Sequence, residues 1–278
     1  MNYSTFKYDK NIQYKDGWNN FALKYSKLLV KDTIYFLTKK VMYSIMEQHI
    51  KLEKGMSILD FNCGTGNDFP YFLEKECTIT GTDYSEGMLN KADEIYRDEI
   101  EKGNIKLLHG AIENLNNTSM QTNKYDLIYS ITGGFSYVDS NQMIKSIEVL
   151  STFLKPKGKI ITAHFGRFSL AESLFYLFRL KIKHIFIRKS KKVKVSIKQK
   201  PYTLFLRTKK EFFNLSKSLS IDAFHPLLFF SPPYQTGYNP SVKRINRLYQ
   251  LESKIKNWGF LSNLSDQFVV VISKKNSK

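Results

Sequence analysis

The stretch Ser57-Ile58-Leu59-Asp60-Phe61-Asn62-Cys63-Gly64-Thr65-Gly66-Asn67-Asp68 determines how the rest of the chain is interpreted. Apolar residues around an acid precede two glycines that flank a threonine, which is the pattern of a buried strand running into a tight turn and a helix N-terminus. Backbone N–H groups at such a turn can meet a ligand. A dinucleotide-binding fingerprint requires G-x-G-x-x-G, but Phe69 stands where the third glycine is needed. The stretch therefore predicts a nucleotide-binding turn that is not of the NAD type.

A second strand and helix are predicted directly after this turn. The strand covers Thr78 to Asp83, and the helix runs from Glu86 to Lys102, with Ser85 as its cap and Gly103 at its end. Asp83 lies about 20 residues beyond the glycine turn, where a carboxylate at the carboxyl end of a strand can accept hydrogen bonds from both ribose hydroxyls. The spacing predicts that Asp83 binds a ribose.

Both stretches resemble motifs of class I S-adenosylmethionine-dependent methyltransferases. The first is similar to the family's D-x-G-C-G-T-G, with Asn62 in place of the first glycine; asparagine tolerates positive φ better than most residues. The segment around Asp83, Gly-Thr-Asp-Tyr-Ser-Glu-Gly-Met-Leu-x-x-Ala, resembles the second motif. The resemblance implies an α/β, Rossmann-like fold whose sheet is mostly parallel with a closing antiparallel strand. It also implies S-adenosyl-L-methionine as the cofactor.

Two further segments are similar to the same family. Gly110-Ala111-Ile112-Glu113-Asn114-Leu115 resembles the G-D-A-E-x-L segment beside adenine, with Ala111 replacing the usual acid. Phe21-Ala22-Leu23-Lys24-Tyr25 resembles an A-x-x-Y segment over the cofactor, although Tyr25 is equally consistent with ordinary packing. The resemblance implies cofactor contacts from Tyr25, Asp60, Asn62, Cys63, Gly64, Gly66, Asp83, Tyr84, Met88, Ala111, Ile112 and Ser130.

The methyl acceptor is expected beside the loop Ile131-Thr132-Gly133-Gly134-Phe135-Ser136-Tyr137, which follows a strand from Tyr125 to Ser130. The two glycines let the backbone approach a ligand closely, and the aromatic rings can face a sulfonium or stack on a flat acceptor. A glycine-rich turn with packed aromatic residues is the alternative. The predicted substrate-binding residues are Gly133, Phe135, Tyr137, Arg167 and Tyr234.

A catalytic candidate lies at the end of the next predicted strand. A helix from Gln142 to Leu154 leads into a strand from Lys159 to His164. His164 then lies at the edge where open α/β sheets bind ligands, and it could accept a proton from an acceptor hydroxyl or amine. A lone histidine is more often structural, so a packing role for His164 is the alternative.

The tetrapeptide Ser231-Pro232-Pro233-Tyr234 resembles the S/D/N-P-P-Y hallmark of enzymes that methylate exocyclic amino groups of DNA bases. In those enzymes it follows the fourth strand, a position that Ser130 to Tyr137 fill here. We therefore interpret it mainly as a loop. Strands at Ile221 to Phe230 and Gln267 to Ser273 are expected to form a closing antiparallel pair.

Positive charge is concentrated in the C-terminal half of this 278-residue chain, whose net charge is +18. Residues 1–150 hold 17 Lys and Arg against 20 Asp and Glu, whereas residues 151–278 hold 26 against 5, a net charge of +21. We expect a helical cap at 1–50 and a methyltransferase domain at 51–278, with an inserted basic lid at 168–219. In the lid we expect a helix from Ser169 to about Lys183 and a strand around Val195.

The leading functional hypothesis is transfer of a methyl group to an oxygen or nitrogen atom of a small molecule, aromatic or anionic. An RNA or DNA methyltransferase, and a non-catalytic module that binds cofactor or an acidic membrane surface, are the alternatives. No apolar run approaches the about 18 residues of a membrane span, and no signal sequence is evident. Only Cys63 and Cys77 are present, so neither a disulfide framework nor a metal site is expected, and a cytoplasmic location is predicted. The oligomeric state is left open.

Overall fold

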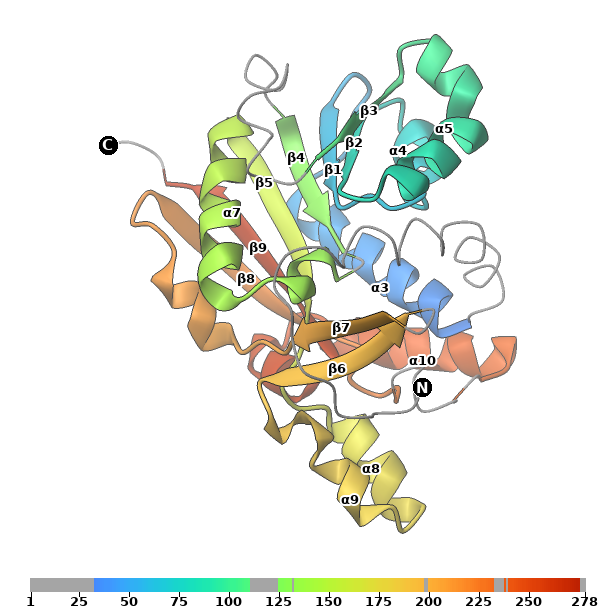
Figure 1. Cartoon of the computed structure of the whole chain (residues 1–278), viewed down its shortest axis with the longest axis vertical. Helices are drawn as coiled ribbons and strands as arrows, with labels where there is room; N and C mark the ends of the chain where they lie inside the picture. Colours follow the sequence, from blue (N-terminus) through green and yellow to red (C-terminus); the bar gives the residue numbers. More distant parts are fainter. Residues whose placement is uncertain are drawn as a thin grey trace.

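The computed structural model describes residues 33–110, 125–131, 133–197, 200–232, 238 and 240–275. Its main sheet has seven strands, namely β1 (Ser57–Phe61), β2 (Thr78–Asp83), β3 (Ile105–His109), β4 (Tyr125–Ser130), β5 (Leu154–Phe165), β8 (Leu219–Leu227) and β9 (Gln267–Lys274). Their order is β3-β2-β1-β4-β5-β9-β8 (Figure 1). The first five strands are parallel, while β9 runs antiparallel to both of its neighbours. The predicted Rossmann-like sheet with a closing antiparallel pair is confirmed.

Helices cover both faces of this sheet. One face packs against α3 (Thr33–His49), α4 (Phe69–Glu74), α5 (Glu86–Glu101) and α10 (Val242–Ile255), and the other against α7 (Ser140–Phe153) and the 3₁₀ helix η4 (Lys209–Asn214). Each face of the sheet has its own hydrophobic core, and strand β9 contributes to both. Its fully buried residues alternate: Val269 and Val271 point into the core on the α3 side, and Phe268, Val270 and Ile272 into the core on the α7 side. Alternation of apolar side chains on both faces is typical of a strand in the middle of a three-layer fold.

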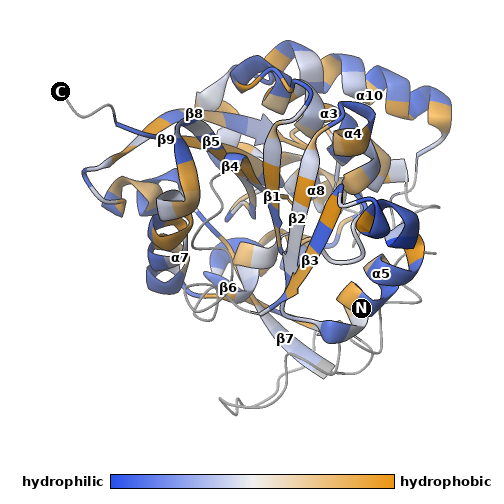
Figure 2. Cartoon of the chain, turned by 90° about the horizontal axis from the view of Figure 1, so that it is seen from above, coloured by the Kyte–Doolittle hydropathy of each residue, from blue (hydrophilic) through white to orange (hydrophobic). Residues whose placement is uncertain are grey.

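Helix α3 belongs to the core of the domain. It lies beside α10 (Figures 1 and 2) and presents an apolar stripe to the sheet. Full burial of each such side chain contributes roughly 1.5–3 kcal/mol, so the helix is held firmly on the sheet. The completely buried members of the stripe are Leu37, Val41, Met42, Ile45 and Met46. Residues 1–32 lie outside the described part of the chain, and the division of the chain at residue 50 stays a prediction.

Local signals in the sequence account for some element boundaries and fail at others. Helix α5 begins as predicted, because the Ser85 hydroxyl accepts a hydrogen bond from the Met88 amide. The helix predicted from Ser169 to Lys183 is wrong: it is split into α8 (Leu170–Phe178) and α9 (Ile182–Ile185). Leu180 lies between them at φ 56°, a left-handed conformation that interrupts a right-handed helix.

The insertion between β5 and β8 forms a separate layer at one end of the sheet. After α8 and α9 it continues through the 3₁₀ turn η3 (Ile187–Lys189) into a two-stranded antiparallel sheet of β6 (Lys192–Ile197) and β7 (Lys200–Phe205). Figure 1 shows α8 and α9 projecting away from the main sheet, with the β6–β7 hairpin between them and the sheet. β7 packs against the 3₁₀ turn η2 (Gly134–Tyr137).

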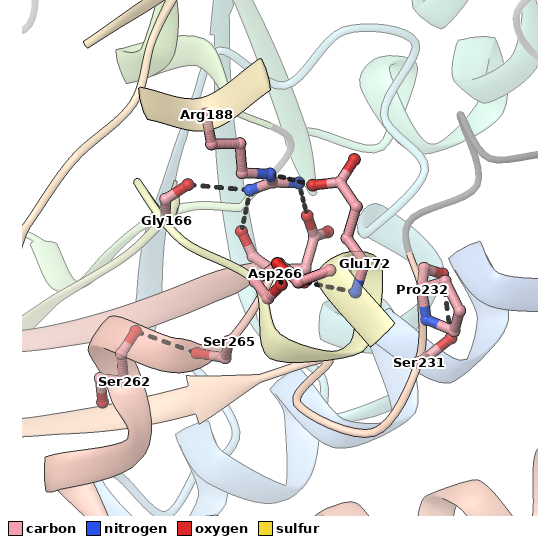
Figure 3. A network of polar contacts seen from close by, with 10 residues as sticks. Gly166, Glu172, Arg188, Ser231, Pro232, Ser262, Ser265 and Asp266 are labelled. Atoms are coloured by element: carbon pink, nitrogen blue, oxygen red, sulfur yellow. Dashed lines mark hydrogen bonds and ion pairs between the residues drawn. The ribbon is translucent and has the colours of Figure 1, made fainter. Parts of the chain in front are cut away.

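Arg188 fastens the projecting part of the insertion to the main domain (Figure 3). Its guanidinium forms ion pairs with Glu172 of α8 and with Asp266, which immediately precedes β9. It also donates hydrogen bonds to the carbonyl oxygens of Gly166, at 2.8 Å, and of Asp266, at 3.2 Å. Because both carboxylates are nearly fully buried, the guanidinium is the cation that compensates their charge.

Replacing Arg188 with methionine is expected to lower the free energy of unfolding by about 3–5 kcal/mol, because two buried carboxylates lose their partner. Urea unfolding followed by circular dichroism measures this loss. The matched control is Lys54→Met, which breaks an ion pair with Glu76 on the surface and should leave the stability unchanged. Equal stability of the two variants would contradict the assigned role of Arg188.

Candidate functional site

The glycine turn after β1 is built from residues with left-handed backbone conformations. Asn62, Gly64 and Gly66 have φ values of 63°, 57° and 74°. Asparagine at position 62 is therefore compatible with the backbone, as its tolerance of positive φ predicted. A Cβ atom on Gly66 or Gly81 would overlap the ring of Phe69, which is completely buried. Phe69, at the position of the missing third glycine, thus fills the space between the turn and β2.

Asp83 is fixed at the carboxyl end of β2 by two backbone amides. Its Oδ2 accepts a hydrogen bond from the Gly64 N–H at 2.8 Å, and its Oδ1 accepts one from the Ser85 N–H at 2.8 Å. Burial raises the pKa of Asp83, while these hydrogen bonds and nearby His109 oppose the rise. Each carboxylate oxygen has a second lone pair, so the group can still accept hydrogen bonds from a diol.

Asp60 supplies a second buried carboxyl group beside the turn. It is 3% exposed, and its Oδ2 has no hydrogen-bond partner among the described residues. Burial, and then the charge of Asp68, raise the pKa of Asp60 well above its usual value, while Lys39 lowers it. A buried oxygen without a partner is costly, so this atom suits a ligand that brings its own donor.

Helix α3 positions the turn through side chains that sequence reasoning missed. Lys39 Nζ lies 3.0 Å from Asp68 Oδ1 and donates to the Asn67 carbonyl oxygen at 2.5 Å. The Tyr43 hydroxyl donates to the same Asp68 oxygen at 2.6 Å. The two residues are four apart and therefore share a helix face. Their spacing was visible in the sequence, but nothing there indicated that this face would meet the turn.

Tyr84 and His109 form an aromatic pair at the ends of β2 and β3. Their ring centroids are 6.4 Å apart with 30° between the planes, and the His109 Nε2–H donates to the Tyr84 carbonyl oxygen at 3.0 Å. Tyr84 is exposed and offers a ring face to a flat ligand, whereas Met88 of α5 is buried. His109 was not predicted, because the parallel register that sets it opposite Asp83 is not evident from its local sequence.

The loop after β4 meets the glycine turn directly. The Asn62 side chain occupies the space that a Cβ atom on Gly134 would need, so the two glycine-rich segments pack against each other. Gly133 has φ 79° and lies against the ring of Phe165. Ser130, at the end of β4, is buried, and its Oγ has no hydrogen-bond partner in the described part of the chain. This loop therefore lies beside the predicted donor site.

The aromatic residues of this loop differ in exposure. Phe135 is buried, with its ring 5.3 Å from that of Phe61 and 5.8 Å from that of His164. Tyr137 is only partly buried, and its ring meets Tyr202 of β7 at 5.9 Å. Phe135 thus supports the loop from the core, and Tyr137 connects it to the insertion.

His164 is completely buried on the α7 side of the sheet. Its Nε2 shares a hydrogen bond of 2.8 Å with Thr162 Oγ1, while its Nδ1 has no partner among the residues described. The rings of Phe212 and Phe268 lie 4.8 and 5.8 Å away. Burial, and then the charge of Arg207, hold the pKa of His164 well below its usual value. The imidazole is therefore neutral near pH 7, and its role as a proton acceptor stays a prediction.

Arg207 is an unpredicted residue that links the acceptor loop to the insertion. It is almost completely buried and donates hydrogen bonds to the carbonyl oxygens of Phe135, at 3.1 Å, and Val138. It also donates to Ser140 Oγ at 2.9 Å and pairs with Glu211. Arg207 was not predicted, because its local sequence does not distinguish it from the other basic residues of the insertion.

Of the remaining predicted site residues, two are described by the structure and four are not. Cys63 is buried in the turn, and burial raises the pKa of its thiol well above the usual value. Arg167 donates to the carbonyl oxygen of Lys189 at 3.2 Å, which directs its guanidinium toward the insertion. Tyr25, Ala111, Ile112 and Tyr234 lie outside the described residues.

The sequence of the chain is similar to those of known methyltransferases. Residues 58–158 match a family model described as a methyltransferase domain. The chain is 29% identical over 148 residues to a demethylmenaquinone methyltransferase of Staphylococcus aureus, an alignment that covers 52% of this chain and 56% of that protein. The chain thus spans little more than half the length of this relative.

Solved structures with a similar fold include two methyltransferases. One is an S-adenosylmethionine-dependent methyltransferase from Clostridium acetobutylicum, with a TM-score of 0.55 and 16% identity, covering 93% of this chain and 99% of that one. The other is magnesium protoporphyrin IX methyltransferase from Synechocystis PCC 6803 with bound SAH, with a TM-score of 0.57 and 12% identity, covering 94% and 98%. At these identities the likeness concerns the fold. Together with the strand order, it shows that the chain has the Rossmann-like fold of class I S-adenosylmethionine-dependent methyltransferases, and the family match assigns residues 58–158 to a methyltransferase domain.

Proposed function

We propose that this protein transfers a methyl group from S-adenosyl-L-methionine to an oxygen or nitrogen atom of a small molecule, aromatic or anionic. The observation that carries the proposal is the Asp83 carboxylate, which two amides fix beside the glycine turn with both oxygens able to accept further hydrogen bonds. This arrangement suits a ribose diol.

The residues at the turn fit the other parts of this cofactor. Asp60 offers an unpartnered buried oxygen to a cationic amino group, and Tyr84 offers a ring face to adenine. The adenine site would be completed by Ala111 and Ile112, as the family resemblance implies. When bound, the cofactor supplies an activated methyl group that needs no nucleophilic side chain of the protein.

The protein's own contribution would be to position the acceptor and exclude water. The loop that holds Gly133 and Tyr137 lies between the donor turn and the β6–β7 hairpin. It meets the turn at Asn62, and its Tyr137 ring packs against Tyr202 of β7. Arg167 and Tyr234 are proposed to contact the substrate, with Tyr234 contributed by the segment of the chain that follows β8. The similarity to a demethylmenaquinone methyltransferase supports a small-molecule acceptor.

A second candidate, methylation of RNA or DNA, is favoured by the net charge of +21 on residues 151–278. Such binding weakens steeply with salt, because counterions are released from the phosphates. Absence of binding to nucleic acid at low salt would therefore exclude it.

Incubation of the protein with metabolite extract and S-adenosylmethionine carrying an isotopically labelled methyl group should label a small molecule that mass spectrometry can identify. Parallel incubations with RNA and DNA should remain unlabelled. Label in nucleic acid alone would contradict the small-molecule assignment. Binding of the donor without any transfer would instead favour a non-catalytic module.

The ring resonances of His164 are expected to stay constant between pH 6 and pH 8. Its lowered pKa keeps the imidazole neutral over this range, so proton-accepting capacity would be lost only when the pH falls through that lower value. NMR titration measures this, with His164→Gln to assign the signal and the urea-unfolded chain, where histidine titrates at about pH 6.5, as the reference. A midpoint at or above 6.5 in the folded protein would contradict the buried neutral state.

A further inference from the structure

The end of the insertion exposes an unusual set of apolar side chains. We define the tip as residues 174–194, from α8 to the start of β6. Phe178 is 83% exposed, Leu180 85% and Phe186 62%. The other exposed apolar side chains of the tip are Leu174, Leu177 and Ile182. Clusters of large apolar residues on a surface mark sites that meet a partner or a membrane.

Basic side chains are interleaved with these apolar residues. The sequence contains no Asp or Glu between Ser173 and Lys210. Glu172, just before the tip, is buried and paired with Arg188, so it does not offset the charge at the surface. The exposed basic residues of the tip are Arg179, Lys181, Lys183, Lys189, Lys191, Lys192 and Lys194.

We propose that the tip binds the surface of an anionic lipid bilayer, with Phe178, Leu180 and Phe186 entering the headgroup region. Short amphipathic segments with basic side chains bind membranes in this way, because apolar burial and attraction to anionic lipid add. No helix in the described part of the chain is long and apolar enough to span a bilayer, so the contact would be peripheral.

The composition of the tip favours lipid over nucleic acid as the anionic partner. Proteins bind single-stranded nucleic acid by stacking bases on aromatic rings along a basic groove. Four of the six exposed apolar residues here are leucine or isoleucine, which cannot stack on bases but do enter lipid. The projection of α8 and α9 away from the main sheet also suits insertion into a surface (Figure 1).

The tip is mechanically connected to the candidate acceptor loop. Arg188 within the tip is held by Asp266 of the main domain, and the chain continues into the hairpin whose Tyr202 meets Tyr137. If the proposed methyl transfer is correct, docking of the tip on a membrane would bring the candidate acceptor loop close to lipid. The substrate would then be a lipophilic molecule. This consequence rests on the proposed function, whereas membrane binding itself does not.

Vesicle flotation with the full-length protein tests the proposal. The wild type should float with vesicles of phosphatidylglycerol and phosphatidylcholine, and remain at the bottom with phosphatidylcholine alone. Raising the salt concentration should weaken the binding, since it screens the surface charge. Phe178→Ser combined with Phe186→Ser should lower the affinity for anionic vesicles by about tenfold or more, as should Lys181→Gln combined with Lys183→Gln.

Matched control variants carry the same substitutions elsewhere. Phe213 and Phe260 are 68% and 69% exposed outside the tip, so Phe213→Ser with Phe260→Ser should leave vesicle binding unchanged. Lys157→Gln with Lys217→Gln removes two exposed charges outside the tip and should also leave vesicle binding unchanged.

Absence of flotation with anionic vesicles at low salt would overturn the proposal. So would an equal loss of vesicle binding in the tip variants and the control variants, or binding of the full-length protein to RNA without binding to vesicles. Isothermal titration of S-adenosylmethionine into the same preparations reports separately on the donor site. A protein that binds vesicles but not the donor would refute the proposed function alone, and one that binds the donor but not vesicles would refute the membrane contact alone.

Discussion

The hydrogen bond from the Gly64 amide to the Asp83 carboxylate is the contact on which the candidate site depends. It is possible because β1 and β2 are adjacent parallel strands, with Phe61 opposite Thr82, so that the turn after one strand meets the end of the other. The same carboxylate accepts from the Ser85 amide at the start of α5. One side chain thus joins two strand ends and a helix, and it keeps its remaining lone pairs for a ligand.

Burial gives this edge of the sheet its electrostatic character. Asp60 is almost completely buried and Asp83 is partly buried, and burial raises the pKa of each. Lys39 from α3 lies close enough to pair with Asp68, which balances part of the negative charge around the turn. A cationic or hydrogen-bond-donating ligand would complete this balance, which is why an amino acid and ribose fit the site better than a phosphate would.

The sequence predicted the parts of the site whose chemistry is local. The turn from Asp60 to Gly66, the position of Asp83 and the start of α5 at Ser85 all depend on neighbouring residues, and their spacing was sufficient. Contacts between distant segments could not be predicted: Tyr43 with Asp68, and Arg207 with the carbonyl of Phe135, join residues 25 and 72 positions apart. The break at Leu180 was also missed, because leucine gives no signal of a left-handed conformation.

The most direct test of the donor site is isothermal titration of S-adenosylmethionine into the wild type and the Asp83→Asn variant. The control is Glu252→Gln, because the Glu252 carboxylate, like that of Asp83, accepts from two amides, those of Phe229 and Phe230, but lies on α10. We predict saturable binding to the wild type and to the control, and affinity reduced by about tenfold or more in Asp83→Asn, because a hydrogen bond to a charged group is lost. No binding to the wild type, or equal affinity in all three proteins, would contradict the account.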